Sequence, residues 1–364
     1  MYGPQPLLPF FAQEFGVTEA QSALLITVTL LPLGFAPLSY GYILQAVSSV
    51  KLLRWSILAL ALTMMAFAGA GVFGVMVGVR FGQGLILPAA MTSLMTYISA
   101  STERAYLQRL MSFYIAATIA GGYLGRLLAG LSATYLTWQF FYYALAVLLL
   151  ICFVALNKLP TQTQVKLARP SPQALWHTLT QGTYLTLYLI IFCTFFVFAG
   201  LLNFLPFRLA DLWGQPSGLA TSFMYTGYLV GIAVSLGSGR IIRFLHGQPN
   251  AIRLAFAVYG LALGLMLLPN TVILFVALLG FCGAMFLVHS VATGLANQMA
   301  TDNQGLVNGL YVAFYYSGGV LGSYLPGLVY QRFGWTALIV VLMMVVGVGI
   351  VLTLGRGLDI QRNS

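Results

Sequence analysis

Two arginines and one histidine lie within long apolar runs of the sequence, far from any acidic residue. Arg80 begins Arg80-Phe81-Gly82-Gln83-Gly84, Arg126 ends a glycine-rich run, and His289 lies in Phe286-Leu287-Val288-His289-Ser290. An arginine at the centre of a bilayer costs about 2.5–3.5 kcal/mol on insertion scales, so it persists only with a partner, a wet cavity or a ligand. Histidine, with an ordinary pKa of about 6.5, could exchange protons. Each residue also has a structural interpretation, because polar side chains hold membrane helices together.

The apolar runs that contain these residues recur along the whole chain. Apolar residues make up 60% of it and charged residues 6%, against roughly 25% charged residues in soluble domains. A helix needs about 20 apolar residues to cross a bilayer, and continuous runs exclude the alternating pattern of a barrel. We therefore expect an all-α integral membrane protein with eleven full transmembrane helices, at residues 21–44, 53–70, 73–98, 108–131, 136–156, 183–207, 218–239, 252–268, 271–297, 306–330 and 336–355.

The sequence repeats itself at an offset of 197 residues. Gly121-Gly122 and Gly125 recur as Gly318-Gly319 and Gly322, and Leu8-Pro9-Phe10 recurs as Leu205-Pro206-Phe207. We therefore expect two pseudo-symmetric bundles of six helices, because parallel repeats need equal halves. The bundles are assigned to residues 1–156 and 182–364, joined by a polar, proline-containing cytoplasmic linker at residues 157–181. The same offset places most of the first helix upstream of Met1, so we expect that helix to be truncated here.

The basic residues predict an orientation and no nucleic-acid partner. The formal net charge is +10, but the basic residues lie in alternate loops. A nucleic-acid binding site would require them in one patch or stripe. Basic residues favour the cytoplasmic side, so the C-terminus is expected inside. Three cysteines lie in apolar segments without metal-site or disulfide spacing, so no metal site is expected; they are Cys152, Cys193 and Cys282. No organic cofactor is expected either.

Two motifs carry a resemblance to a known family. Arg80 followed by Gln83-Gly84 resembles the fourth-helix motif of the major facilitator superfamily, whose arginine is linked to the substrate cavity or to proton coupling. Gly121-Gly122-Tyr123-Leu124-Gly125-Arg126, continuing to Gly130, resembles the glycine-rich fifth-helix motif of its exporters, in the bacterial branch that includes acriflavine-sensitivity permeases. Glycines four residues apart let helix backbones approach closely. The expected packing and gating residues are Gly84, Gly121, Gly122, Gly125, Gly130, Gly318, Gly319 and Gly322.

The second half contributes further candidates, and one expected motif is degraded. Tyr315 and Tyr316 could line a cavity, although tyrosines also anchor helices at the membrane surface. In the loop after the second helix, Gln45 and Ala46 replace the aspartate and arginine of the superfamily's gate motif, which puts ordinary latching in doubt. The candidate substrate or coupling residues are Arg80, Gln83, Arg126, His289, Tyr315 and Tyr316.

The resemblance implies a monomeric secondary transporter in the bacterial cytoplasmic (inner) membrane. It would move a small organic solute by alternating access, with proton-coupled efflux as the expected activity. Uptake or uniport by the same fold remains an alternative, as does an inactive or truncated relic. An enzyme is not expected, because the expected spans hold no carboxylate and no cluster of histidines or cysteines for catalysis.

Overall fold

The computed structural model describes residues 1–160, 176, 178–299 and 304–355, and all regular structure within them is helical. A short turn, η1 (Gln5–Leu7), leads into α1 (Leu8–Phe15). The rest of the first half comprises α2 (Glu19–Ala46), α3 (Ser49–Ala68), α4 (Phe73–Ser101), α5 (Arg104–Tyr135) and α6 (Trp138–Ala155), followed by η2 (Leu156–Lys158). The second half comprises α8 (Gly182–Trp213), α9 (Gly218–Met224), α10 (Gly227–Phe244), α11 (Gln248–Leu265), α12 (Thr271–Met299) and α13 (Gln304–Leu354).

The all-α membrane fold is confirmed, and each of the eleven expected ranges falls on helix. Two details differ. Residues 218–239 form two helices, α9 and α10, separated at Tyr225 and Thr226. The last two ranges form the single element α13, in which Gly334, with φ of 76°, breaks the helical backbone. This left-handed conformation favours glycine, which has no Cβ to clash.

Seven helical segments among the described residues are long and apolar enough to cross a membrane. These seven include α13 as one segment although Gly334 divides it, and the fully described part of α2, Glu19–Phe35, is apolar but shorter than a full span. α5 and α11 are not among the seven, and both contain arginines and other polar residues.

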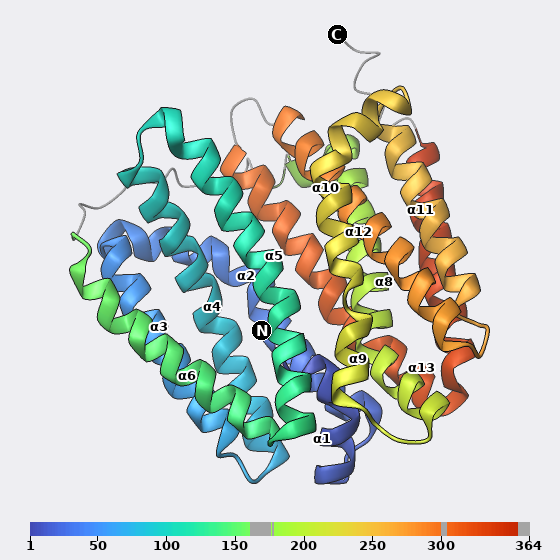
Figure 1. Cartoon of the computed structure of the whole chain (residues 1–364). Coiled ribbons are helices and arrows are strands. Elements are labelled where there is room, and N and C mark those ends of the chain that lie inside the picture. Colours follow the sequence, from blue (N-terminus) through green and yellow to red (C-terminus); the bar gives the residue numbers. More distant parts are fainter. Residues whose placement is uncertain (161–175, 177, 300–303, 356–364) are drawn as a thin grey trace.

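The helices form two groups that meet along a central seam (Figure 1). On one side of the seam, α2 of the first half packs on α13 of the second. On the other side, α5 packs on α9 and α10. These two contacts are related as expected for a twofold repeat, because the helices that meet in one are the repeat counterparts of the helices that meet in the other. The linker assigned to residues 157–181 lies mostly outside the described residues, so its bounds stay a prediction.

The short helix α1 is fixed to the end of the first bundle. Trp138 Nε1 donates a 2.8 Å hydrogen bond to Glu14 Oε2, and the Phe11 ring meets the Trp138 ring edge-on at 5.1 Å. At the corresponding place in the second half, Tyr330 Oη donates a 2.8 Å hydrogen bond to Asp211 Oδ2. Glu14 and Asp211 are repeat counterparts, so each half holds its first helix through a carboxylate. α1 and η1 thereby place residues 1–7 in the seam between the halves.

Candidate functional site

Arg126 lies on α5 at the centre of the seam, and its side chain is 0% exposed. Its Nε donates to Gln5 Oε1 at 2.7 Å, its Nη1 to the Gly122 carbonyl at 2.7 Å and its Nη2 to Tyr228 Oη at 2.8 Å. All three acceptors are neutral. The guanidinium is therefore satisfied by hydrogen bonds, but the site keeps its positive charge.

Aromatic rings surround the same guanidinium. The ring centroids of Tyr2, Tyr228 and Tyr225 lie 4.4, 4.5 and 5.1 Å from Arg126 Cζ. A cation over an aromatic face is stabilised by about 0.5–2 kcal/mol, more where water is excluded. Hydrogen bonds and rings together explain how Arg126 remains buried with no carboxylate partner among the described residues.

The Arg126 site is built from both halves of the molecule. Gln5, which accepts from Arg126, donates through Nε2 to Asn203 Oδ1 on α8 at 2.6 Å. The side-chain nitrogen of the same asparagine, Asn203 Nδ2, is buried and has no hydrogen-bond partner among the described residues. An unpaired buried donor costs roughly 1–3 kcal/mol. The site thus contains one cation and one unused donor, both of which favour an added acceptor.

Arg80 on α4 has a different environment. It is 1% exposed, donates through Nε to the Leu25 carbonyl at 2.7 Å and through Nη1 to Gln83 Oε1 at 2.7 Å, and bonds the Met1 carbonyl through Nη2. Gln83 in turn donates to Met64 Sδ at 3.7 Å. All of these partners belong to the first half. The arrangement fits a residue that fixes the first bundle, and its role in binding or coupling stays a prediction.

The structure brings His289, Tyr315 and Tyr316 together in the second half. His289 Nδ1 lies 3.0 Å from Tyr311 Oη, and its ring centroid lies 5.1 Å from that of Tyr315. Tyr315 stacks on Phe195 at 3.9 Å and meets Tyr316 edge-on at 5.1 Å. These contacts join α12, α13 and α8. They form a second cluster, separate from the hydrogen bonds of Arg126.

The predicted packing glycines divide into two sets. A Cβ at Gly84 would collide with the Thr29 backbone of α2, and one at Gly130 would collide with Gly218 and Ser222 of α9. In α13, Gly318, Gly319 and Gly322 lie against Phe192, Phe195 and Phe196 of α8. In contrast, within the described part of the chain, Gly121 and Gly125 have no neighbouring atom within 4 Å of a Cβ, and Gly122 meets only the Arg126 side chain at 3.7 Å. A packing role for those three is not seen in this conformation.

Contacts between α5 and α9 close the seam at one end. Leu219 N donates to Thr134 Oγ1 at 3.1 Å, and Ser222 Oγ donates to the Arg126 carbonyl at 2.8 Å. Between them lies the close approach of Gly130 and Gly218. This end carries the turn after Tyr135, and the bundle's alternation places it opposite the linker. The two halves are therefore closed on that side.

Gly130→Ala is expected to open this end. The added Cβ would overlap Gly218 O and Ser222 Oγ, and backbone atoms cannot yield as a flexible side chain can. Spin labels at Tyr135→Cys and Gln215→Cys, both exposed and on opposite sides of the seam, would report a longer distance in Gly130→Ala. The exposed Cys152 is first replaced by serine. Gly121→Ala, in open space on the same helix, is the control, and equal distances in both variants would refute the expectation.

Several central residues were not predicted from the sequence. Gln5, Asn203 and Tyr228 complete the Arg126 hydrogen bonds, and Tyr2 and Tyr225 supply rings. One signal was available, because Asn203 is a polar residue inside an apolar run. Gln45 and Ala46, which interrupt the expected gate motif, have side chains outside the described residues.

Comparison with known proteins agrees with the fold. The family model described as Major Facilitator Superfamily matches residues 1–288. An uncharacterized MFS-type transporter of Bacillus subtilis (strain 168), YybF, is 27% identical over 93% of this chain and 85% of its own length. The inner membrane transport protein YnfM of Escherichia coli (strain K12) is 26% identical over 95% of this chain and 86% of its own length.

Solved structures give the same result for the fold. A point mutant of the nucleoside transporter NupG superposes with a TM-score of 0.79 at 14% identity, over 97% of this chain and 94% of its own. A bacterial homologue of the human lysosomal transporter Spinster, in an inward-facing and unoccupied conformation, superposes with a TM-score of 0.74 at 14% identity, over 98% and 91%. The chain belongs to the Major Facilitator Superfamily and has the fold of its secondary transporters.

Proposed function

We propose that this protein is a secondary active transporter that moves a small organic anion or zwitterion by alternating access, with Arg126 as the central binding residue. One observation carries the proposal. Arg126 is fully buried, is held only by neutral acceptors, and is bonded to groups from both halves of the fold. A buried guanidinium without a carboxylate is suited to receive one from a ligand, because its planar fork matches carboxylate or phosphate geometry.

Such a ligand would couple binding to movement. Tyr228 belongs to the second half and Gly122 to the first, so Arg126 now bridges the halves. An anion that replaced Tyr228 Oη as the acceptor of Arg126 Nη2 would remove a bond between the halves and weaken the closed seam. In alternating access the two bundles rock around a site near the midplane. Replacing the Tyr228 hydroxyl by a ligand oxygen as the acceptor of Arg126 would therefore allow the two bundles to move relative to each other.

We further propose export in exchange for protons, across the bacterial inner membrane, by a monomer whose C-terminus is cytoplasmic. The resemblance of the run from Gly121 to Arg126 to exporter motifs favours efflux, and the distribution of basic residues favours this orientation. His289 is the residue assigned to proton exchange, because it is a titratable side chain within an expected span. It is bonded to Tyr311 and in ring contact with Tyr315. Uptake or uniport through the same site is the alternative.

The test measures proton movement in energised inside-out vesicles with a pH-sensitive dye while organic anions, zwitterions and cations are added in turn. Wild type is expected to dissipate the proton gradient on addition of an anion or zwitterion, and vesicles without the protein are the control. Dissipation by cations alone would contradict the assigned charge preference. Solute flux without proton movement would favour uniport. If a well-folded protein produces no response to any compound, the alternative of an inactive relic would be favoured.

His289→Gln is expected to uncouple transport from protons in the same vesicles. Glutamine can still bond Tyr311 Oη but cannot titrate. Solute-driven proton movement should fall to background, whereas exchange of labelled for unlabelled solute, which needs no net proton flux, should persist. Tyr311→Phe removes the bond and keeps the titratable ring as the matched control. Normal proton movement in His289→Gln would exclude this histidine as the coupling group.

A further inference from the structure

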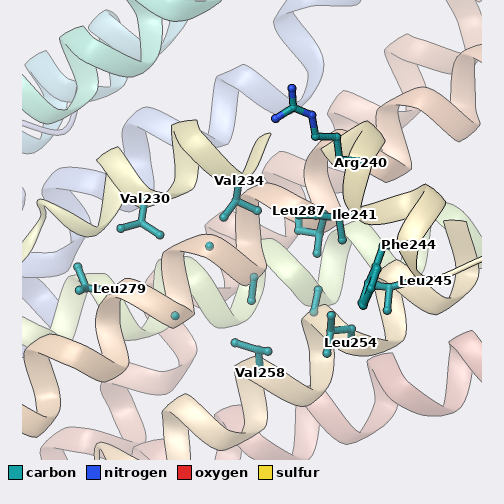
Figure 2. A pocket seen from close by; sticks show the side chains of 14 residues that line it. Val230, Val234, Arg240, Ile241, Phe244, Leu245, Leu254, Val258, Leu279 and Leu287 are labelled. Carbon is teal, nitrogen blue, oxygen red and sulfur yellow. The ribbon is translucent and has the colours of Figure 1, made fainter. Parts of the chain in front are cut away.

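A groove lies between α10 and α11 on the surface of the second half, with α12 as its floor (Figure 2). Its volume is about 510 Å³, within the roughly 300–1,000 Å³ of ligand pockets. α10 and α11 each pack along α12 but contact each other little, which leaves the groove between them. Small residues of α12 make the floor low: Gly280, Gly283 and Ala284.

The walls of the groove are apolar and face outward. Val230 and Val234 line it from α10, and Val258 lines it from α11. At its rim, Phe244 is 80% exposed and Leu254 is 44% exposed. In a membrane protein, exposed apolar side chains of this kind contact acyl chains. The groove therefore opens toward lipid.

One end of the groove is cationic. Arg240 is the charged residue among those that line it, and Arg243 follows one turn later on α10; both side chains are exposed. In Figure 2 the Arg240 guanidinium extends outward from the rim. This end of α10 lies on the side that the basic residues assign to the cytoplasm, where the leaflet surface is negative and a basic residue gains about 1 kcal/mol near it.

We propose that the groove binds one anionic phospholipid, with an acyl chain against α12 and its phosphate at Arg240 and Arg243. An apolar groove with arginines at one end complements an amphiphile with an anionic head group. A polar solute would leave its polar groups unpaired along the valine walls, at a cost of several kcal/mol. The proposal concerns lipid alone and stands whether or not the cargo is an anion.

The test counts lipids retained by the purified protein in native mass spectrometry, after mixing with phosphatidylglycerol or phosphatidylcholine of identical acyl chains. Wild type is expected to retain one phosphatidylglycerol in clear preference to phosphatidylcholine. In Arg240→Gln combined with Arg243→Gln, retention of phosphatidylglycerol should fall by roughly tenfold or more, to the level of phosphatidylcholine. Arg332→Gln removes an exposed arginine at the opposite end of the bundle and should change nothing.

A second variant tests the groove itself. Gly280→Leu would fill the floor, where a Cβ meets only Val258 Cγ1 at an ordinary 3.6 Å, and should lower the retention of both lipids. Gly264→Leu, at a glycine of α11 in open space that does not line the groove, is the matched control. Each variant must elute as a single species by size exclusion. Undiminished phosphatidylglycerol retention in the double arginine variant, or equal retention of both lipids by wild type, would overturn the proposal.

Discussion

Arg126→Lys is expected to lower transport by at least about tenfold although it preserves the charge. The Arg126 guanidinium donates hydrogen bonds in three directions, to Gln5, to the Gly122 carbonyl and to Tyr228. Lysine presents a compact ammonium and lacks the planar fork that can hold these groups or a ligand carboxylate together. Initial rates of solute flux in proteoliposomes measure the effect. Arg332→Lys, at an exposed arginine, is the control.

Arg126→Gln separates charge from shape at the same position. Loss of one member of a buried, hydrogen-bonded charged pair costs about 2–5 kcal/mol, so the affinity for an anion should fall by roughly 30-fold to several thousand-fold. The flux of any neutral compound that the protein carries should fall far less. If Arg126→Lys transports normally, the site needs only a positive charge. If Arg126→Gln still binds anions as wild type does, Arg126 is a structural residue and the proposed function loses its basis.

The helices were predictable from the sequence because a span leaves a long apolar run, and each expected range fell on helix. The interruptions were less visible. α9 ends after seven residues and α10 begins three residues later, although residues 218–239 contain no charged residue and no proline. The break depends on local backbone geometry at Tyr225 and Thr226, and hydropathy does not report geometry.

The candidate site was half predictable for a related reason. Arg126 stood out because charge in an apolar run is costly. Its partners did not, because Gln5, Asn203 and Tyr228 come from distant segments and become neighbours only when the two halves meet. A single sequence contains no signal for such a meeting, and even the repeat does not help, since Ser323 occupies the position equivalent to Arg126.

The repeat also predicted equal roles for glycines that the structure treats differently. Gly318 and Gly322 lie against the backbone at Phe192 and Phe196 of α8, whereas their counterparts Gly121 and Gly125 face open space. A motif predicts that a glycine can pack closely, but whether it does depends on which helix lies opposite.

Gly322→Ala is accordingly expected to destabilise the protein, and Gly125→Ala to keep its stability or raise it slightly. At Gly322 a Cβ would overlap Phe196 O and lie 2.6 Å from Phe196 Cα, so α13 would have to move away from α8. Overpacking of this kind costs about 1–3 kcal/mol, which should lower the Tm in detergent by several degrees. At Gly125 the same methyl group meets no atom within 4 Å, and alanine favours the helix over glycine by roughly 1 kcal/mol.

The two glycine variants are a matched pair, since each adds one methyl group at the same place in the repeat. Thermal unfolding of both in the same detergent measures the difference directly. Equal Tm values would mean that α13 can shift on α8 without loss, and that these close contacts do not hold the second bundle together. A fall in Tm for Gly322→Ala alone would show that this bundle depends on close contact between α8 and α13. Gly125→Ala with normal Tm but slower solute flux would place Gly125 at a surface that closes only in another state of the transport cycle.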